Sequence, residues 1–550
     1  MSPDRRRIAG PRPGRPDQPF PPPRRPGTFR WGAILLIPAL LIGAGLIDQA
    51  EDRPTSGVSV AGLGPASWLP TAFPAKAVGS AWYCAGGTAA AGANANHEVY
   101  LFNPSDRSLT ATVTAYPSKG DPKDTVVSVA ARMRVVVRLA ELVDAPYAAA
   151  SVESTSSRLI VQQRVSGSLG YDLAACSNRA GSTWYFPGGS TAFGNDEVLA
   201  IFNPFAADAT VNISFVTDSA ELDARTRSPQ AFQGMAVPGR SLVVARVTDK
   251  VSRQNNVVAT VQATSGSVVV DQLQAFGGDL QPAPTGGTGS QPGDGTGSDV
   301  PPEAKPNPGL TLHPGVPVAA TRWAFPDGRK ADGARESVLV YNPSGQAADV
   351  DIGVVLSPTG ATGPVPPVAP IEITGLGSNE FQIISIADET RVPAGVDHTI
   401  TVRSLKGVPV IAQRLLTGAS PWDHSGAAAV TGSPVMAKRW LLATGSALPT
   451  VTQDIAVFNP TKRPATVTAT FLDSGKPVTP ATRARVVVPP GGRATLSLPA
   501  LGLPATDLGT IVSATGPVVV EQSLLEGGGQ LGLSSTIATP LPEDLAPLPG

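Results

Sequence analysis

The hydrophobic and polar residues follow two different patterns along the chain. Residues 31–47 form an apolar run without a charged side chain. From residue 81 onwards, short segments alternate apolar and polar residues and are separated by Gly, Pro and Asn. Alternation with a period of two is typical of β-strands that bury one face. The sequence therefore predicts a single N-terminal membrane-spanning helix followed by a long all-β region.

The alternating segments recur in four copies. Each copy begins with a Trp followed by hydrophobic residues and a Gly, and the Asn of an Asn-Pro dipeptide lies 19 or 21 residues after the Trp. The repeated residues are Trp82, Trp184, Trp323 and Trp440, then Asn103, Asn203, Asn342 and Asn459, and near the end of each copy Gln163, Gln272, Gln413 and Gln522. This spacing indicates an internal repeat.

The Asn-Pro dipeptide predicts a turn, because Asn is favoured at the first position of a type I turn and Pro at the second. Alternation resumes after the dipeptide, so we interpret the flanking strands as a β-hairpin. Each copy continues to a total of about seven short strands in roughly 90–100 residues, which is typical of an immunoglobulin sandwich. The predicted fold is all-β, with four tandem immunoglobulin-like β-sandwich modules in two pairs.

Repeat spacing and composition give the boundaries. The exits from modules 1 and 3 resemble each other, as do those from modules 2 and 4, which indicates that a two-module unit was duplicated. A Gly-, Pro-, Ser- and Thr-rich stretch predicts a flexible linker between the pairs. The predicted parts are a linker at 51–80, module 1 at 81–176, module 2 at 177–276, the inter-pair linker at 277–320, module 3 at 321–418, an inter-module segment with module 4 at 419–535, and a C-terminal tail at 536–550.

Charge adds a direction to the membrane segment. Residues 1–30 are Pro-rich and hold eight Arg and two Asp, although the whole chain has a net charge of −1. The positive-inside rule then predicts a disordered cytoplasmic tail at 1–30, an anchor at 31–50 and an extracytoplasmic β-region. A cleavable signal peptide is the alternative, and it also places the β-region outside the cytoplasm.

The chain has two cysteines, Cys84 and Cys176, both in module 1. An even number of cysteines outside the cytoplasm predicts a disulfide. Two buried free thiols, the alternative, would suit a cytosolic protein better. The predicted bond joins the Trp strand of module 1 to the end of that module.

Few residues suggest catalysis. None of the four histidines, His97, His313, His398 and His424, has a Cys, His or acidic neighbour at metal-ligand spacing. We find no nucleophile elbow, zinc-protease motif or phosphate loop. The β-region has no excess of basic residues, so nucleic acid is an unexpected partner. The sequence therefore predicts no cofactor, no metal and no enzyme activity, although two carboxylates that meet only in space would give a hydrolase without a local motif.

Residues repeated in all four modules are best explained by the fold, since a Trp at one place in every module buries a large area. A binding site is expected where the copies differ. The segments that leave modules 1 and 3 place an aromatic residue beside an acid, at Tyr171-Asp172 and at Trp422-Asp423-His424. Loops at the end of a sandwich commonly carry recognition. The alternative is that these aromatics cover the joints between modules.

The pattern from Trp82 to Leu531, with its Trp, Gly-Gly, Phe-Asn-Pro and closing Val-rich strands, resembles the actinobacterial secreted proteins grouped as domain of unknown function 5719. That family has no established activity, so the resemblance supplies no catalytic residue. It implies an association with cell-envelope glycan assembly, because genes of its members lie near envelope glycosyltransferases.

The expected function is that of a non-catalytic, membrane-tethered scaffold or binding protein of the bacterial cell envelope. The expected partners are the membrane, through one helix, and an envelope protein or glycan. A glycan-binding surface protein is one alternative, which requires exposed aromatic platforms. A hydrolase of the envelope without a recognisable motif is the second.

Overall fold

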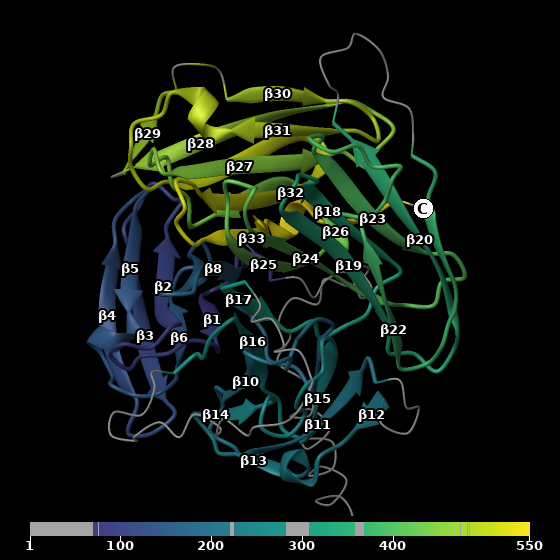
Figure 1. Ribbon diagram of the computed structural model, residues 1–550. Helices are drawn as coiled ribbons and strands as arrows, with labels where there is room; N and C mark the ends of the chain where they lie inside the picture. The colour runs from purple at the N-terminus through teal and green to yellow at the C-terminus, as the bar shows by residue number, and fades with distance from the viewer. Residues whose placement is uncertain are drawn as a thin grey trace, which may run out of the picture. The chain divides into compact units, whose positions relative to one another are not determined.

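The computed structural model describes residues 70–74, 76–219, 225–281, 307–357, 368–473, 475–480, 482 and 484–549. The predicted tail and anchor lie outside these residues, and so does most of the 51–80 linker. No helix among the described residues is long and apolar enough to cross a membrane. Residues 62–550 form one compact unit, and its described part consists mainly of antiparallel β-strands (Figure 1).

Module 1 contains two sheets, with the strand orders β1-β6-β3-β4 and β5-β2-β7-β8. The strands are β1 (Ser80–Cys84), β2 (Asn96–Phe102), β3 (Leu109–Pro117), β4 (Lys123–Val129), β5 (Arg134–Arg138), β6 (Ala148–Ser154), β7 (Ile160–Gly167) and β8 (Gly170–Ala175), with a 3-10 turn, η2 (Leu139–Glu141), after β5.

Module 2 repeats this plan, with the orders β12-β11-β15-β9 and β14-β10-β16-β17, and with β13 beside β11. Its elements are β9 (Thr183–Phe186), β10 (Asp196–Asn203), β11 (Ala209–Thr217), β12 (Thr226–Arg227), η3 (Gln230–Phe232), β13 (Met235–Val237), β14 (Ser241–Arg246), β15 (Val257–Ser265), β16 (Val269–Phe276) and β17 (Gly309–Pro314). Strand β17 lies inside the stretch predicted to be a linker at 277–320, so part of that stretch belongs to a sheet.

Module 3 has the orders β18-β23-β20-β21 and β22-β19-β24-β25. Its strands are β18 (Arg322–Gly328), β19 (Ala334–Asn342), β20 (Ala348–Leu356), β21 (Ile371–Leu376), β22 (Glu380–Ser385), β23 (His398–Ser404), β24 (Ile411–Gly418) and β25 (Gly426–Thr431). The last of these lies in the predicted inter-module segment.

In module 4, strand β32 is long enough to take part in both sheets, beside β26 and β28 in one and beside β27 and β33 in the other. The elements are β26 (Val435–Leu442), β27 (Val451–Phe458), β28 (Ala465–Asp473), β29 (Lys476–Val478), β30 (Arg485–Val488), β31 (Arg493–Ser497), η4 (Leu498–Leu501), β32 (Gly509–Glu526), β33 (Leu533–Ile537), β34 (Thr539–Pro540), η5 (Pro542–Asp544) and β35 (Ala546–Pro547).

The predicted hairpin at each Asn-Pro is wrong. In module 1, β2 pairs with β5 and β7, whereas β3 pairs with β4 and β6. The Asn-Pro loop therefore connects the two sheets instead of two neighbours in one sheet. Alternation reports that one face of a strand is buried, which is equally true when the next strand joins the opposite sheet.

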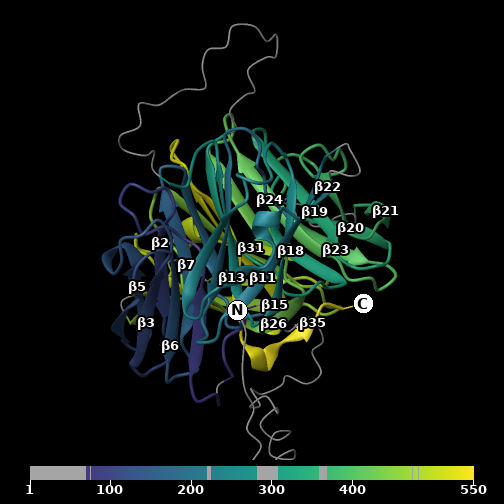
Figure 2. The ribbon, with the colours of Figure 1, turned by 90° about the horizontal axis from the view of Figure 1, so that it is seen from below.

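Each module has an additional strand, β8, β17, β25 or β33, which follows the strand carrying the repeated Gln and pairs with it. We call these four the inner strands. They contact one another in cyclic order, β8 with β17, β17 with β25, β25 with β33, and β33 with β8 (Figure 1). Figure 2 shows the β-region from below, with β3, β5 and β6 of module 1 on one side and β20, β21 and β22 of module 3 on the other. Modules 2 and 3 are therefore linked through their inner strands in the same way as the other neighbouring modules. The sequence had predicted two separate pairs of modules instead.

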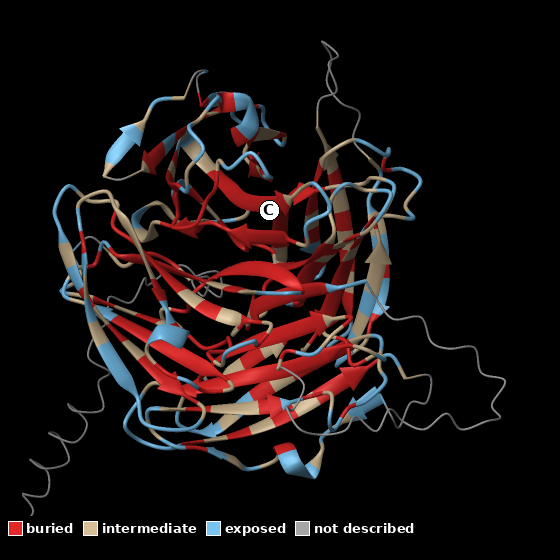
Figure 3. Cartoon of the chain, turned by 60° about the vertical axis from the view of Figure 1, so that its left-hand side comes forward, coloured by how far each residue is buried: buried red, intermediate tan, exposed pale blue. Residues whose placement is uncertain are grey.

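Buried residues lie along the middle of the strands, whereas exposed residues gather in loops and edge strands (Figure 3). The cores continue across joints between modules: Leu441 and Leu472 of module 4 belong to the hydrophobic cluster of module 1. One cluster also includes residues of both module 3 and module 4, among them Trp323 and Trp440. Burial thus joins the modules as well as filling each of them.

Candidate functional site

The repeated Trp residues lie in the cores. Each indole N–H donates to a backbone carbonyl three or four residues before the repeated Gln, which satisfies the polar atom that burial would otherwise leave unpaired. The pairs are Trp82 with Leu159 at 3.1 Å, Trp184 with Val268 at 2.8 Å, Trp323 with Val410 at 2.9 Å and Trp440 with Val518 at 3.1 Å.

The repeated Asn residues are buried nodes of the loops that connect the two sheets. Asn103 donates to the carbonyls of Arg107, Val129 and Ala130, and its oxygen accepts from the N–H and hydroxyl of Ser105. Asn203, Asn342 and Asn459 make equivalent bonds. Such a node holds two loops of a module together, so its repetition follows from the fold.

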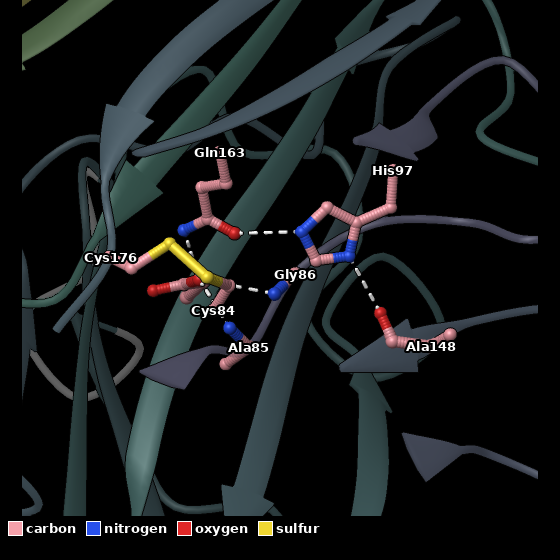
Figure 4. Close-up of a disulfide and its surroundings, with 8 residues drawn as sticks. Cys84, Ala85, Gly86, His97, Ala148, Gln163 and Cys176 are labelled. Carbon is pink, nitrogen blue, oxygen red and sulfur yellow. Dashed lines mark hydrogen bonds between the residues drawn. A yellow bond between two sulfur atoms is a disulfide. The ribbon is translucent and has the colours of Figure 1, made fainter. Parts of the chain in front are cut away.

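The predicted disulfide is confirmed. Cys84 and Cys176 are joined, with their Cα atoms 4.7 Å apart, and they lie beside a buried joint between modules 1 and 2 (Figure 4). There the Asp271 carboxylate accepts from the backbone N–H groups of Ala85 at 2.9 Å and Gly86 at 3.1 Å. Burial raises the pKa of Asp271 to about 6, and hydrogen bonds to its ionised form oppose that shift.

The repeated Gln163 completes this joint. Its amide nitrogen donates to Asp271 at 2.7 Å and its oxygen lies 3.0 Å from a ring nitrogen of His97. His97 in turn lies against Gly87, where a Cβ atom would come within 2.3 Å of the His97 side chain. The second Gly of the module 1 motif therefore leaves room for a buried polar side chain.

A side chain that accepts from backbone N–H groups of the neighbouring module, as Asp271 does, occurs at two more joints. The residue before the repeated Gln reaches the end of the Trp strand, or the loop directly after it, in the neighbouring module. In this way Gln162 of module 1 accepts from the N–H groups of Ala443 and Thr444 in module 4. Glu521 of module 4 accepts from the N–H of Asp327 in module 3. The corresponding residue of module 3 is Ala412, which offers no such acceptor at the joint with module 2.

Modules 3 and 4 also share a buried group of charges, the module 3–4 ion cluster. Its members are Asp327, Arg329, Glu336, Asp397, His398, Arg414, Asp454, Arg493 and Glu521. Arg414 lies 2.7 Å from Glu521, and both side chains are at most 1% exposed. Burial acts to raise the pKa of Asp327, but Arg329, Arg414 and Arg493 together hold it below its ordinary value. Since guanidinium groups face the carboxylates, the cluster is suited to joining modules.

Tyr171 and Asp172 do not lie on a loop. Both belong to the inner strand β8 and are buried. Asp172 accepts from the backbone N–H of Leu312 in module 2 at 2.8 Å and from the hydroxyl of Ser534 in module 4 at 2.7 Å. Burial raises the pKa of Asp172 well above its ordinary value. This carboxyl therefore belongs to the contacts between three modules and is not available to an external ligand.

Trp422, Asp423 and His424 lie in the bend between β24 and β25. Trp422 packs against the small hydrophobic cluster formed by Ala428, Leu525 and Leu533, and its ring meets that of His424 edge to face at 5.0 Å. His424 contacts the carbonyl of Glu526 in module 4 at 2.7 Å, whereas Asp423 is exposed. These contacts give the aromatic residues a place at the joint between modules 3 and 4.

The ends of the inner strands surround a pocket that no sequence motif indicated. It encloses about 720 Å³, a volume that includes the solvent at its open mouth. Leu173, Leu312, Val430 and Ile537 contribute one hydrophobic side chain from each inner strand, and Trp323 adds an aromatic wall. We call it the inner pocket. All four modules contribute a strand to it.

His313 and Thr431, together with Ser535 and Thr536, are the polar residues in the otherwise apolar lining of the inner pocket. His313 of β17 is hydrogen-bonded through Nε2 to the Thr431 hydroxyl of β25. The Nδ1 atom of His313 is buried and has no hydrogen-bond partner among the described residues. Burial lowers the pKa of His313 to about 3, so the imidazole is neutral at physiological pH. The lining is therefore uncharged, and it offers a ligand mainly apolar surface.

The described residues contain no group of three or more His, Cys, Asp or Glu that could hold a metal ion.

The chain was compared with known protein families and with curated proteins. Residues 148–369 match a family of unknown function, DUF5719, a range that begins in module 1, includes module 2 and ends in module 3. No curated protein matches the chain.

Two solved structures are similar to this chain. One is a tetra-tandem repeat in the extending region of a large adhesion protein, at 14% identity, with 84% of this chain and 99% of that chain covered and a TM-score of 0.10. The other is the α-L-rhamnosidase of Streptomyces avermitilis in complex with L-rhamnose, at 12% identity, with 77% and 54% covered and a TM-score of 0.13. At these TM-scores neither likeness defines a fold or a function for this chain.

Proposed function

We propose that this protein is a non-catalytic binding and scaffolding protein of the bacterial cell envelope, tethered to the membrane by residues 31–50 with its β-region outside. The inner pocket is the observation that carries this proposal. Four modules each contribute a strand to one uncharged, largely apolar pocket, an environment that suits the binding of an apolar group. General acid–base chemistry instead needs a titratable group near neutral pH, and the His313 imidazole, with its low pKa, is not such a group.

We further propose that the four modules are variants of the immunoglobulin sandwich. The adjacent strands β2 and β5, and likewise β3 and β6, correspond to the B–E and C–F neighbours of that fold. The modules differ from it at the edges: β1 lies beside β6, where the immunoglobulin fold places its last strand, and β7 joins the opposite sheet. This exchange leaves β7 free to pair with the inner strand β8.

The disulfide between Cys84 and Cys176 supports the extracytoplasmic location, because structural disulfides persist in oxidising compartments. The resemblance to the actinobacterial family extends the proposal to an actinobacterial envelope and to the assembly of its glycans, with an envelope protein or glycan as partner.

A neutral apolar fluorophore, N-phenyl-1-naphthylamine, tests the inner pocket. Its fluorescence should rise on binding to the purified β-region. Ala175 lines the pocket at the end of β8, so Ala175→Leu should fill part of it and weaken binding at least about fivefold, which corresponds to about 1 kcal/mol. Ala206→Leu, the same change at an exposed loop residue, is the control. Equal binding by both variants and by the unchanged protein would contradict a ligand site in this pocket.

A further inference from the structure

A second cleft, of different chemistry, lies between modules 1 and 4. It encloses about 560 Å³ including its open mouth. Its polar walls consist of Tyr100, Arg134, Arg164 and Tyr171 from module 1, and Ser446, Asp507 and Glu526 from module 4. Tyr171, Leu173, Val451 and Leu524 form a hydrophobic cluster at the same place. We call this site the module 1–4 cleft.

Two buried donors in this cleft lack partners. The Tyr171 side chain belongs to a residue that is only 6% exposed, and its hydroxyl has no hydrogen-bond partner among the described residues. The Nε atom of Arg164 is also buried and has no hydrogen-bond partner among the described residues. The Arg164 guanidinium lies 4.5 Å above the ring of Tyr171. Buried polar atoms are nearly always satisfied, so two such donors in one cleft indicate an acceptor supplied from outside.

The charges of the cleft are balanced. Arg134 is paired with Asp507 at 3.0 Å. Arg164 lies 3.9 Å from Glu98. Burial raises the pKa of Glu526, and the charge of Arg164 partly opposes that rise. An anionic ligand would meet these carboxylates together with the guanidinium groups. The cleft therefore does not select a net charge, but it offers donors and acceptors side by side.

Mixed donors and acceptors beside an apolar wall match a neutral carbohydrate. Each sugar hydroxyl both donates and accepts a hydrogen bond, and the C–H face of the ring is apolar and packs on aliphatic and aromatic side chains. A purely apolar ligand would leave the donors of the cleft unpaired, which costs binding free energy.

The residues that carry this chemistry are not required by the fold. Arg164 lies directly after the repeated Gln, at the position of Leu273, Arg414 and Ser523 in modules 2, 3 and 4. By its pairing with the strand that carries the repeated Gln, Tyr171 corresponds to Leu310, Ala428 and Leu533 in modules 2, 3 and 4. Tyr171 is thus specific to module 1, whereas an Arg after the repeated Gln also occurs in module 3.

We propose that the module 1–4 cleft binds a neutral saccharide, with the Tyr171 hydroxyl and the Arg164 guanidinium donating to its oxygen atoms. This site differs from the inner pocket in its chemistry, because its lining is mainly polar where that of the inner pocket is mainly apolar, although Leu173 contributes to both.

Saturation-transfer NMR on the purified β-region tests this proposal, with the methyl glycosides of glucose, galactose and mannose and with N-acetylglucosamine as probes. At least one of them should show saturation transfer, and calorimetry then gives its affinity. Tyr171→Phe removes one hydroxyl and keeps the ring, so it should weaken that affinity roughly 3- to 10-fold. It should not lower the free energy of unfolding, because the hydroxyl has no protein partner. Tyr341→Phe, a buried tyrosine of module 3, should leave the affinity unchanged.

Three outcomes would overturn the proposal: no saturation transfer to any of the four sugars, equal affinity for Tyr171→Phe and the unchanged protein, or tighter binding of glucuronate or inorganic phosphate than of the neutral sugars. The last would show that the guanidinium groups select an anion. Ala175→Leu in the inner pocket should keep full sugar affinity, so failure of one site is distinguishable from failure of the other.

Discussion

Arg414 in the module 3–4 ion cluster offers the sharpest test of how the modules are held together. Its guanidinium donates to the Glu521 carboxylate at 2.7 Å and to the Ser535 hydroxyl at 2.8 Å. Glu521 also accepts from Ser535 at 2.6 Å and from the Asp327 N–H at 2.9 Å. Arg414→Met keeps most of the aliphatic volume and removes the charge. Glu521 would then remain buried without its strongest partner.

The expected loss in the free energy of unfolding is about 3–5 kcal/mol, the usual cost of removing one partner of a buried ion pair. Two hydrogen bonds to Glu521 survive, which places the expected value at the lower end of that range. Burial already raises the pKa of Glu521 although Arg414 opposes it, so without Arg414 the carboxyl should take up a proton instead of keeping its charge. The double variant Arg414→Met, Glu521→Gln removes both charges and should recover most of the loss.

Urea unfolding followed by Trp fluorescence measures these differences through the midpoint and slope. Hydrogen exchange then locates the effect, since peptides from β24 and β32 should lose protection before those of module 2. Arg132→Met is the matched control: its partner Asp106 lies 2.5 Å away, but both side chains are exposed, and exposed pairs contribute little. If Arg414→Met changes the stability no more than Arg132→Met does, the cluster does not hold modules 3 and 4 together.

Three further predictions concern other parts of the chain. Burial raises the pKa of Glu197 from 4.5 to about 7, so between these pH values the folded state binds more protons than the unfolded state and the stability falls as the pH rises. Glu197→Gln should therefore raise the free energy of unfolding at pH 8 by roughly 2–3 kcal/mol and change it little at pH 4, as urea midpoints at both pH values will show. Replacing Cys84 and Cys176 with Ala should lower the free energy of unfolding by about 2–5 kcal/mol, measured by the same titration with the disulfide verified by non-reducing peptide mapping. Reporter fusions after Gly27 and Thr55 should report opposite sides of the membrane, and the same side for both would refute the tether.

Local sequence signals predicted the strands and the residues that anchor them. Alternation identified strands such as β3 and β11, each with one buried face, and the disulfide followed from two cysteines in an extracytoplasmic setting. The inner strands were missed because they are buried on both faces, so the Gly-Tyr-Asp-Leu-Ala-Ala segment of β8 shows no alternation. Strand β17 was concealed by the Gly- and Pro-rich composition of the residues before it.

The candidate sites could not be predicted, because their residues are far apart in the chain. Tyr171 and Glu526 line the module 1–4 cleft together, and Gln162 meets Thr444. Strand β7 pairs with β2 and β8 instead of with β6. This pairing decides which side chains reach the joints, and it depends on tertiary contacts. The Tyr171-Asp172 dipeptide was correctly noticed as a difference between copies, but its side chains have separate surroundings: Asp172 lies in the contacts between modules, and Tyr171 lines a cleft.

The cyclic contacts of the inner strands have a consequence for how the protein tolerates damage. Module 1 docks on module 4 through Gln162, so the first and last modules are held by contacts as well as by the chain that leads from one to the other. A cleavage site engineered at 282–306 would break the chain between β16 and β17 of module 2, yet the pairing of β16 with β17 and the contacts of module 1 with module 4 would keep both fragments together. Because those contacts act at high effective concentration until the last of them opens, the cleaved protein should elute as one species under native conditions and separate only in denaturant.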